Sequence, residues 1–354
     1  MLVPVHDAGV HLEGCLRSIA EQSLGFEHIE VVAVDDGSTD GSAAVLDAWA
    51  ARHPGRVRVV HQENSGAPGG PRNRAVAMAE GEFLFFADPD DYLGAEALER
   101  MLAAAERDGS DVVLGRIKGV GRKAPITPFR RSVEGGDVFT TKAVWSLTAH
   151  KLFRRSLVLE HGLCFTEGVR LAEEQVFVVS AYLLARSISV VADYDCYYLV
   201  RREGFPHLTQ QMPDPVPFYG VVRDVLGVVV ERVPPGARRD GLLIRWLTLE
   251  VVGRFDERFA ELPEETRALC VKLAGELVRD FFPAEVVARL DPLARARCLL
   301  LEQGLVDELT SVTALMAEAR TPAAPRRGPR RGAAWARRRL RAARRLLRRL
   351  LLPG

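Results

Sequence analysis

The chain has 354 residues, of which 47% are hydrophobic and 27% are charged. At about 150 residues per domain, this length allows two domains with sizeable cores, and the composition excludes a disordered chain. No run of about 18 apolar residues occurs, so a transmembrane helix is not predicted, and the first residues do not resemble a secretory signal.

Charge and cysteines bear on partners and compartment. Residues 321–354 hold twelve of the 48 basic residues and no carboxylate, so the rest of the chain has 36 basic against 47 acidic residues. A basic tail on an acidic body concerns binding partners rather than the fold. The five cysteines are scattered and form no CxxC pair. This pattern disfavours a disulfide framework or a structural zinc site and favours a reducing cytoplasm.

Strand and helix signals alternate over the first 115 residues. Strands are predicted at 2–5, 29–34, 57–61, 82–87 and 111–115. Helices are predicted at 9–22, 43–51, 73–79 and 95–107. This alternation predicts an α/β domain with a mostly parallel, doubly wound, Rossmann-like sheet, whose ligands bind at the carboxyl ends of the strands.

The pattern weakens after residue 115. Further strands are predicted at 115–120, 138–140, 188–191 and 196–200, and helices at 150–161 and 171–186. From residue 213 to about 319 the pattern is helical, and 321–329 has the composition of a linker. The chain is therefore predicted to comprise an α/β domain at 1–210, a helical region at 211–320 and an Arg-rich tail at 321–354.

Carboxylates follow two of the predicted strands. Asp35 and Asp36 either accept hydrogen bonds from a base or ribose, or form a turn and helix cap. Asp88 and Asp90, with Asp91 beside them, either share a divalent cation or form an ordinary acidic turn. Because both positions are carboxyl ends of strands, we expect the two groups to lie close together.

Two further segments are candidates for chemistry. The glycine-rich segment from Asn64 to Arg74 would bring backbone amides and Arg72 to a phosphate, or would be a flexible surface loop. Glu173 and Glu174 would raise each other's pKa, as suits a general base, or would be acids that favour a helix start.

The order of these segments resembles that of family 2 glycosyltransferases, inverting enzymes of the GT-A fold that use nucleotide sugars. The matching strings are VPVHDAGVHLEGCLRSIAEQS, VVAVDDGSTDGS, ENSGAPGGPRNRAV, GEFLFFADPDDYL and AEEQVF. The resemblance extends to about residue 205. Within the family, residues 146–210 look most like bacterial enzymes that glycosylate wall teichoic acids and related surface glycans.

The resemblance implies a role for each matching residue. The implied nucleotide-sugar-binding residues are Pro4, Val5, His6, Asp35, Asp36, Asn64, Gly66, Arg72, Asn73 and Asp88. Asp88 and Asp90 would bind Mn²⁺ or Mg²⁺; His207 is a further metal or diphosphate contact, or an ordinary surface-loop histidine. Glu174 stands at the position of the catalytic base with Glu173 before it. The family usually has an aspartate there, so this side chain is one methylene longer.

The tail has a separate pattern. Residues 335–352 place alanines and leucines on one helical face and arginines on the other. This predicts a basic amphipathic helix on an anionic membrane surface. The alternatives are that the helix docks on the acidic body or binds nucleic acid without specificity.

Together these features predict a metal-dependent inverting glycosyltransferase, a hexosyl- or N-acetylhexosaminyltransferase. It would move a sugar from a nucleotide sugar, a UDP-sugar by resemblance, to a polyol-phosphate or glycan acceptor of the cell envelope. We expect it in the cytoplasm, on the inner face of the plasma membrane, with the helical region shaping the acceptor site or forming a homo-oligomer. The alternative is a non-catalytic scaffold of the same fold that binds an anionic membrane or polymer through its tail.

Overall fold

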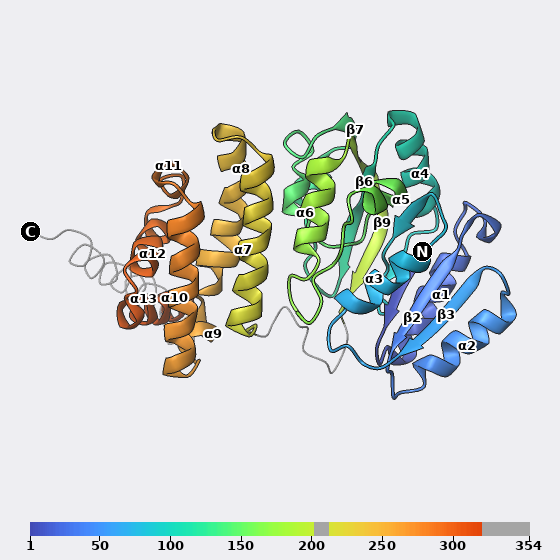
Figure 1. Cartoon of the computed structure of the whole chain (residues 1–354), viewed down its shortest axis with the longest axis horizontal. Helices are drawn as coiled ribbons and strands as arrows, with labels where there is room; N and C mark the ends of the chain where they lie inside the picture. Colours follow the sequence, from blue (N-terminus) through green and yellow to red (C-terminus); the bar gives the residue numbers. More distant parts are fainter. Residues whose placement is uncertain (202–211, 321–354) are drawn as a thin grey trace, which may run out of the picture. The chain divides into compact units, whose positions relative to one another are not determined.

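The computed structural model describes residues 1–201 and 212–320 (Figure 1). The chain divides into two compact units, one ending at Gln211 and one beginning at Met212. His207, the predicted linker 321–329 and the predicted helix 335–352 lie outside the described residues. Within the part of the chain that is described, no helix combines the length and the apolar character needed to cross a bilayer.

Three parallel strands begin the N-terminal unit. They pair in the order β1 (Leu2–Val5), β2 (Val31–Asp36) and β3 (Val57–Gln62). Every residue of the central strand β2 is buried, as its continuous apolar run predicts. The connecting helices are α1 (Leu12–Ala20), α2 (Ser42–Arg52) and α3 (Gly69–Met78). Asp35 and Asp36 are the last two residues of β2, at its carboxyl end.

A second sheet completes this unit. Its strands pair in the order β4 (Phe83–Phe85), β8 (Leu152–Arg154), β6 (Val112–Val120), β9 (Ile188–Val200) and β5 (Tyr92–Leu93), with β7 (Val133–Gly136) beside β9. An isolated parallel bridge from Leu2 to Phe86 links the two sheets. Only β6 and β9 pair in parallel. The unit is α/β as predicted, but this sheet is mixed rather than mostly parallel, because loops and short turns replace several helical crossovers.

Three local predictions need correction. Residues 138–140, predicted as a strand, form a turn in which Asp137 Oδ1 accepts hydrogen bonds from the backbone of Phe139 and Thr140. The predicted helix 150–161 divides into β8 and the short helix α5 (Arg155–Glu160), because residues 152–154 pair with neighbouring strands. The predicted strands 188–191 and 196–200 are one strand, β9.

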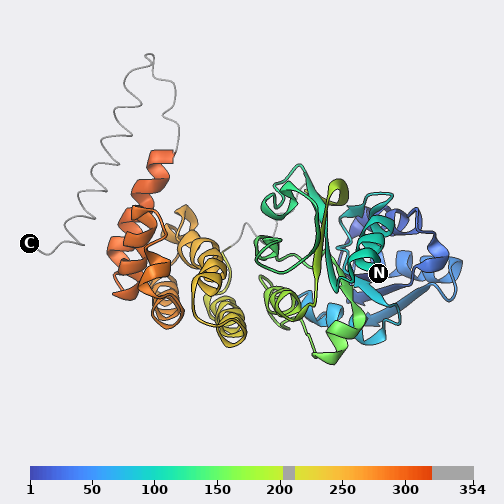
Figure 2. The ribbon, with the colours of Figure 1, turned by 90° about the horizontal axis from the view of Figure 1, so that it is seen from above.

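Helices cover both sides of the strands in this unit (Figure 2). Helix α4 (Ala97–Asp108) packs on β6 and β9, and α6 (Gln175–Leu184) follows the predicted base. Short 3-10 turns occur at Gly9–His11, Phe26–His28, Thr127–Arg130 and Ala143–Trp145. A cluster of buried aromatic rings ties β4, β8 and α6 together and comprises Phe86, Phe153, Phe165 and Phe177. This core fixes the segments that carry the candidate site.

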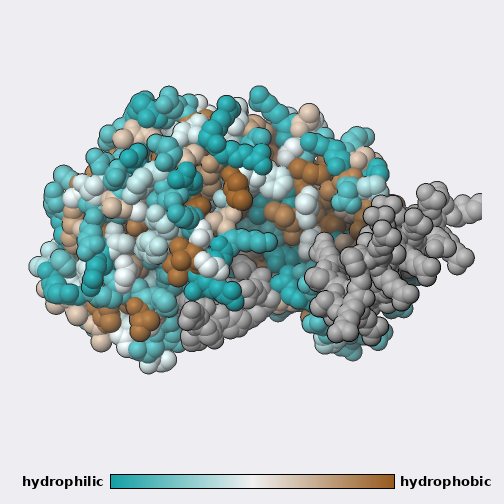
Figure 3. Space-filling model, turned by 180° about the vertical axis from the view of Figure 1, so that it is seen from behind, coloured by the Kyte–Doolittle hydropathy of each residue, from teal (hydrophilic) through white to brown (hydrophobic). Residues whose placement is uncertain are grey.

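The described part of the C-terminal unit is helical, as predicted. Its helices are α7 (Pro215–Arg232), α8 (Ala237–Trp246), α9 (Glu257–Ala260), α10 (Glu264–Phe281), α11 (Ala284–Val287), α12 (Pro292–Glu302) and α13 (Val306–Arg320). A π-helical turn at Leu247–Val251 and a 3-10 turn at Val252–Arg254 follow α8. Asp214 caps α7 by accepting a hydrogen bond from Val216 N. Figure 3 shows a mostly hydrophilic face with only small hydrophobic patches.

Candidate active site

Asp36 ends β2 in a pocket of neutral hydrogen-bond donors. The residue is 3% exposed. Its Oδ1 accepts from Gln62 Nε2 at 2.6 Å and from Ser65 N at 3.0 Å, and its Oδ2 accepts from Ser65 Oγ at 2.8 Å. Buried carboxylates need such partners, because an unsatisfied charge costs far more than a satisfied one. The carboxylate is therefore held in one orientation by the chain itself.

Asp35 has a different set of partners. Its Oδ1 accepts from Ser38 N at 3.1 Å, and its Oδ2 lies 2.9 Å from His61 Nδ1. Burial alone would raise the pKa of Asp35, but the bonds from His61 and Ser38 hold it below its ordinary value. The same contact, together with one from Asp47, raises the pKa of His61. The Asp35 carboxylate is thus partnered by a histidine side chain, unlike that of Asp36.

The rim beside Asp36 contains other residues that the sequence singled out. His6 Nδ1 lies 2.9 Å from Asp36 O, and its Nε2 lies 3.3 Å from Asn64 Nδ2. Asn64 Oδ1 accepts from Gly66 N at 2.6 Å. Residues 4–5 are buried in β1 directly before His6. The structure therefore brings His6, Asn64 and Gly66 together next to the end of β2.

Arg72 joins two groups that lie 85 residues apart in sequence. Its side chain is 7% exposed. Nη1 donates to Glu173 Oε1 at 2.6 Å, and Nη2 donates to Asp88 Oδ1 at 2.8 Å. Burial would lower the pKa of Arg72, but the two carboxylates raise it above its ordinary value. One guanidinium therefore places the acids after β4 and the acids before α6 in a single site.

Asn73, the neighbour of Arg72, has a bracing role. Its Oδ1 accepts from Phe165 N at 2.8 Å, and its Nδ2 donates to Phe165 O at 3.0 Å and to Glu167 Oε1 at 2.8 Å. At Gly69, the first residue of α3, a Cβ atom would lie 2.3 Å from Thr166 O. Only glycine allows so close an approach. The side chain predicted to bind nucleotide thus holds α3 against residues 165–167.

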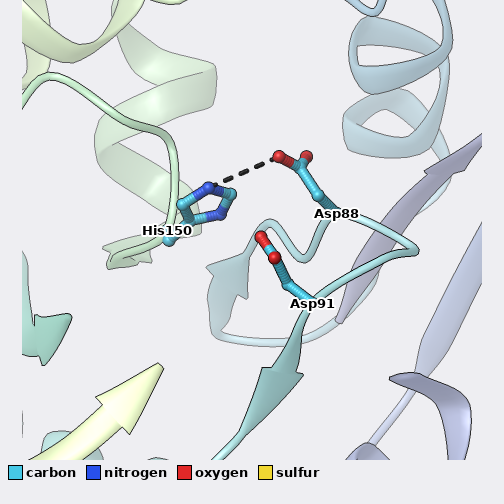
Figure 4. A group of neighbouring side chains, drawn as sticks. All are labelled: Asp88, Asp91 and His150. Carbon is cyan, nitrogen blue, oxygen red and sulfur yellow. Dashed lines mark ion pairs between the residues drawn. The ribbon is translucent and has the colours of Figure 1, made fainter. Parts of the chain in front are cut away.

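Asp88, Asp91 and His150 form a cluster of potential metal ligands (Figure 4). One ligand atom from each lies within 4.8 Å of the others. His150 Nε2 lies 3.5 Å from Asp88 Oδ2, and its ring stacks on Tyr197 at 4.2 Å. Asp91 Oδ1 accepts from Val200 N at 2.7 Å. The sequence predicted Asp88 but missed His150, which belongs to no recognisable motif.

The pKa values of the three members of this cluster are shifted in different directions. Burial, together with the carboxylates of Asp88 and Asp90, raises the pKa of Asp91 to about 8. Burial lowers the pKa of His150 to about 4, so the imidazole is neutral. Burial would also raise the pKa of Asp88, but its contacts with His150 and Arg72 hold it low.

The donor set of this cluster suits a hard divalent cation. Two carboxylates and a neutral imidazole are ligands that Mn²⁺ accepts, and a cation would remove the repulsion that raises the pKa of Asp91. The residues therefore fit a cation. Asp90 is half-buried beside this cluster but is not one of its three members.

Glu173 and Glu174 stand directly before α6. The preceding residue, Ala172, has a φ of 71°, a left-handed conformation that alanine rarely adopts. Burial and the neighbouring Glu173 raise the pKa of Glu174 well above its ordinary value. A carboxylate whose pKa is raised is a stronger base and is suited to proton transfer.

Lys151 is a charged residue of this region that the sequence did not reveal. It is 1% exposed, and its Nζ donates to Thr148 O. Burial lowers the pKa of Lys151 to about 7, against the opposing effect of Glu174. Glu174 thus acts electrostatically on a lysine of the segment that contains His150.

The fold that carries these residues is an α/β fold of the GT-A class. Residues 1–164 match the family model Glycosyl transferase family 2. Residues 215–313 match the model Glycosyl transferase TarS linker domain. The N-terminal unit is therefore a glycosyl transferase family 2 domain.

Individual relatives agree with this assignment. A poly(ribitol-phosphate) beta-glucosyltransferase of Bacillus spizizenii is 38% identical over 230 residues, which are 65% of this chain and 36% of that protein. The poly(ribitol-phosphate) beta-N-acetylglucosaminyltransferase TarS of Staphylococcus aureus is 34% identical over 249 residues, 70% of this chain and 43% of that protein. The chain thus spans about two-fifths of the length of these curated relatives.

A solved structure extends the likeness beyond the matched sequence. S. aureus TarS 1-349 in complex with UDP-GlcNAc matches with a TM-score of 0.80 at 29% identity, over 89% of this chain and 90% of that one. The predicted GT-A fold with a helical C-terminal region is therefore confirmed.

Proposed function

We propose that the chain is an inverting glycosyltransferase that moves a glucosyl or N-acetylglucosaminyl group from a UDP-sugar to a hydroxyl of poly(ribitol phosphate). The names of the two relatives support the sugar and the acceptor, and the UDP-GlcNAc in the TarS structure supports the donor. One observation carries the proposal: Arg72 joins Asp88 to Glu173, so that the donor-side acids and the candidate base share one site.

The donor would lie across the carboxyl ends of β1, β2 and β4. The carboxylates of Asp35 and Asp36 accept hydrogen bonds from N–H and O–H groups, as uracil and ribose would supply. Asp88 and Asp91, with His150 and the predicted ligand Asp90, would hold Mn²⁺ or Mg²⁺. When bound, such a cation offsets negative charge on a departing diphosphate.

Glu174 would serve as the base for the acceptor. Its carboxylate takes the proton of the attacking hydroxyl, whose oxygen bonds to the anomeric carbon while the bond to the diphosphate breaks. Attack from the face opposite the diphosphate inverts that carbon. The raised pKa of Glu174 makes its carboxylate a stronger base for this proton.

The test measures UDP release and sugar transfer with UDP-glucose or UDP-GlcNAc and poly(ribitol phosphate), with and without Mn²⁺. Glu174→Gln should lower kcat by about 10²–10⁴-fold, the usual contribution of a general base, with UDP affinity retained. Glu160→Gln, on the exposed end of α5, is the matched control. Full transfer by Glu174→Gln would remove this residue from the mechanism, and absence of transfer by the wild-type chain would favour the scaffold alternative.

We also propose that residues 335–352 hold the protein on the inner surface of the plasma membrane. Their alternation of arginine and leucine supports this location. The full chain should float with anionic liposomes, and a chain lacking residues 321–354 should not. Equal flotation of the two would contradict the proposal.

A further inference from the structure

The segment that joins β6 to β7 is strongly basic. Together with the end of β6 it carries Arg116, Lys118, Arg122, Lys123, Arg130 and Arg131. The last described residue of the N-terminal unit, Arg201, lies beside this segment. None of these cations has a role in the donor site described above.

Two of these cations share a single carboxylate within the fold. Asp195 of β9 accepts from Arg116 Nε at 2.6 Å and from Lys118 Nζ at 3.0 Å. No carboxylate among residues 1–201 and 212–320 forms an ion pair with Arg122, Lys123 or Arg201. The segment therefore carries excess positive charge, which includes the charges of Arg122, Lys123 and Arg201.

The backbone brings the unpaired cations to the edge of the site. Arg201 N donates to Val120 O at 2.9 Å, which continues the β6–β9 pairing by one residue. Gly121, with a φ of 70°, lies so near that a Cβ there would be 3.2 Å from the Cβ of Arg201. Val200, the residue before Arg201, donates to Asp91. Arg122 and Arg201 therefore follow the paired ends of β6 and β9. Val200 at the end of β9 holds Asp91, a member of the group of potential metal ligands.

Arg122 lies two residues beyond the end of β6 (Val112–Val120). Arg122 is half-buried, and its backbone is fixed by a tight turn in which a Cβ on Gly119 would lie 1.9 Å from Arg122 O. An arginine on a backbone fixed in this way is suited to binding a phosphate with two parallel hydrogen bonds.

A hollow adjoins the same segment. Its volume is about 380 Å³, and it is lined by Lys118, Pro125, Ile126, Phe129 and Asp195 among others. Ile126 is 73% exposed there. This volume is in the range of sites for small organic ligands. Apolar carbon and a carboxylate beside cations suit a polyol chain that carries phosphates.

We propose that Arg122 and Arg201, with Lys123, bind a phosphodiester of the polyanionic acceptor next to the polyol unit that receives the sugar. The inference rests on the proposed function, because it assigns the acceptor side of the same site. Donor binding is left to Arg72 and the acids, so the acceptor and the donor diphosphate contact separate cations.

The test compares Arg122→Ala and Arg122→Ala/Arg201→Ala with Arg56→Ala in the full chain. Arg56 is exposed before β3, at the opposite end of that strand from the site. The Kd for poly(ribitol phosphate) by calorimetry should rise about tenfold or more in the double variant, as expected when charged hydrogen bonds are lost. The Kd for UDP should stay within about twofold, and its salt dependence should be unchanged.

Three outcomes would overturn the inference: an unchanged Kd for the polymer, an equal loss of UDP affinity, or the same loss in Arg56→Ala. An equal loss of UDP affinity would assign these arginines to the donor diphosphate instead. Free ribitol, which lacks phosphate, should bind all variants alike. Polymer binding is measured without turnover, so the result is independent of whether sugar transfer is observed.

Discussion

The two acidic groups of the N-terminal unit are stabilised in different ways. At the end of β2, Asp36 accepts three hydrogen bonds from an amide, a backbone N–H and a hydroxyl. After β4, Asp88 faces the cation of Arg72, while the pKa of Asp91 is raised to about 8 by burial and neighbouring carboxylates. The first group is complete without a ligand, whereas the second retains repulsion that a ligand would relieve.

The largest effect should follow from removing the cation of the second group. Arg72→Met leaves Asp88 and Glu173 without their shared partner and should lower the free energy of unfolding by about 3–5 kcal/mol. Urea denaturation measures this loss. Arg74→Met, exposed on the same helix, should change stability by less than about 0.5 kcal/mol.

A double variant distinguishes the effect of uncompensated charge from general damage to the packing of the core. Glu173→Gln in the Arg72→Met background removes one of the two uncompensated charges. It should therefore recover part of the lost stability. Equal losses in Arg72→Met and Arg74→Met, or no recovery in the double variant, would contradict the account of the second group.

A smaller loss is expected in the first group, where no cation is involved. Asp36→Asn replaces one acceptor oxygen with an NH2 group that faces other donors, and it should cost about 1–3 kcal/mol of unfolding free energy. Asp224→Asn, exposed on α7, is the control and should be near neutral. A loss as large as that of Arg72→Met would show that the two groups depend on charge alike.

The smallest effect concerns pH and the contact between Asp35 and His61. The raised pKa of His61 gives stability that is present below its ordinary pKa and is lost as pH rises through the folded value. The lowered pKa of Asp35 gives stability that is lost as pH falls through its folded value. Stabilisation is therefore greatest between these two values.

The corresponding variant is His61→Gln. The imidazole is 45% exposed, so solvent screening limits the loss to less than about 1 kcal/mol at pH 6. Thermal unfolding at pH 6 and pH 9 should show a smaller difference from the wild-type chain at pH 9. A larger difference at pH 9 would refute the assignment of the charge to His61.

The first group was accessible from sequence for a physical reason. Buried parallel strands are continuous apolar runs, so β1, β2 and β3 and the acids that follow β2 could be predicted. Helix α3 was predicted four residues late, because the glycines and proline at 69–71 are typical of loops. That error placed Arg72 in a loop, whereas Arg72 lies in the helix and its side chain contacts Asp88 and Glu173.

The second group was only partly accessible. Asp88 belongs to a short acidic motif, but His150 and Lys151 are single polar residues in an apolar segment. That segment was predicted as a helix, and β8 forms there because the sheet pairs on both of its sides. Burial by distant strands, which no local pattern reveals, gives these two residues their shifted pKa values.

At Gly69 and Thr166, the backbone of α3 packs directly against the segment before the glutamate pair, with no room for a side chain between them. The alignment of the guanidinium is consequently set by the spacing of two backbones, with every charge intact. A single added methyl group at residue 69 would force these backbones apart. Misalignment of the Arg72 guanidinium and loss of its charge are thus separable defects. A larger residue at position 69 would produce the misalignment alone.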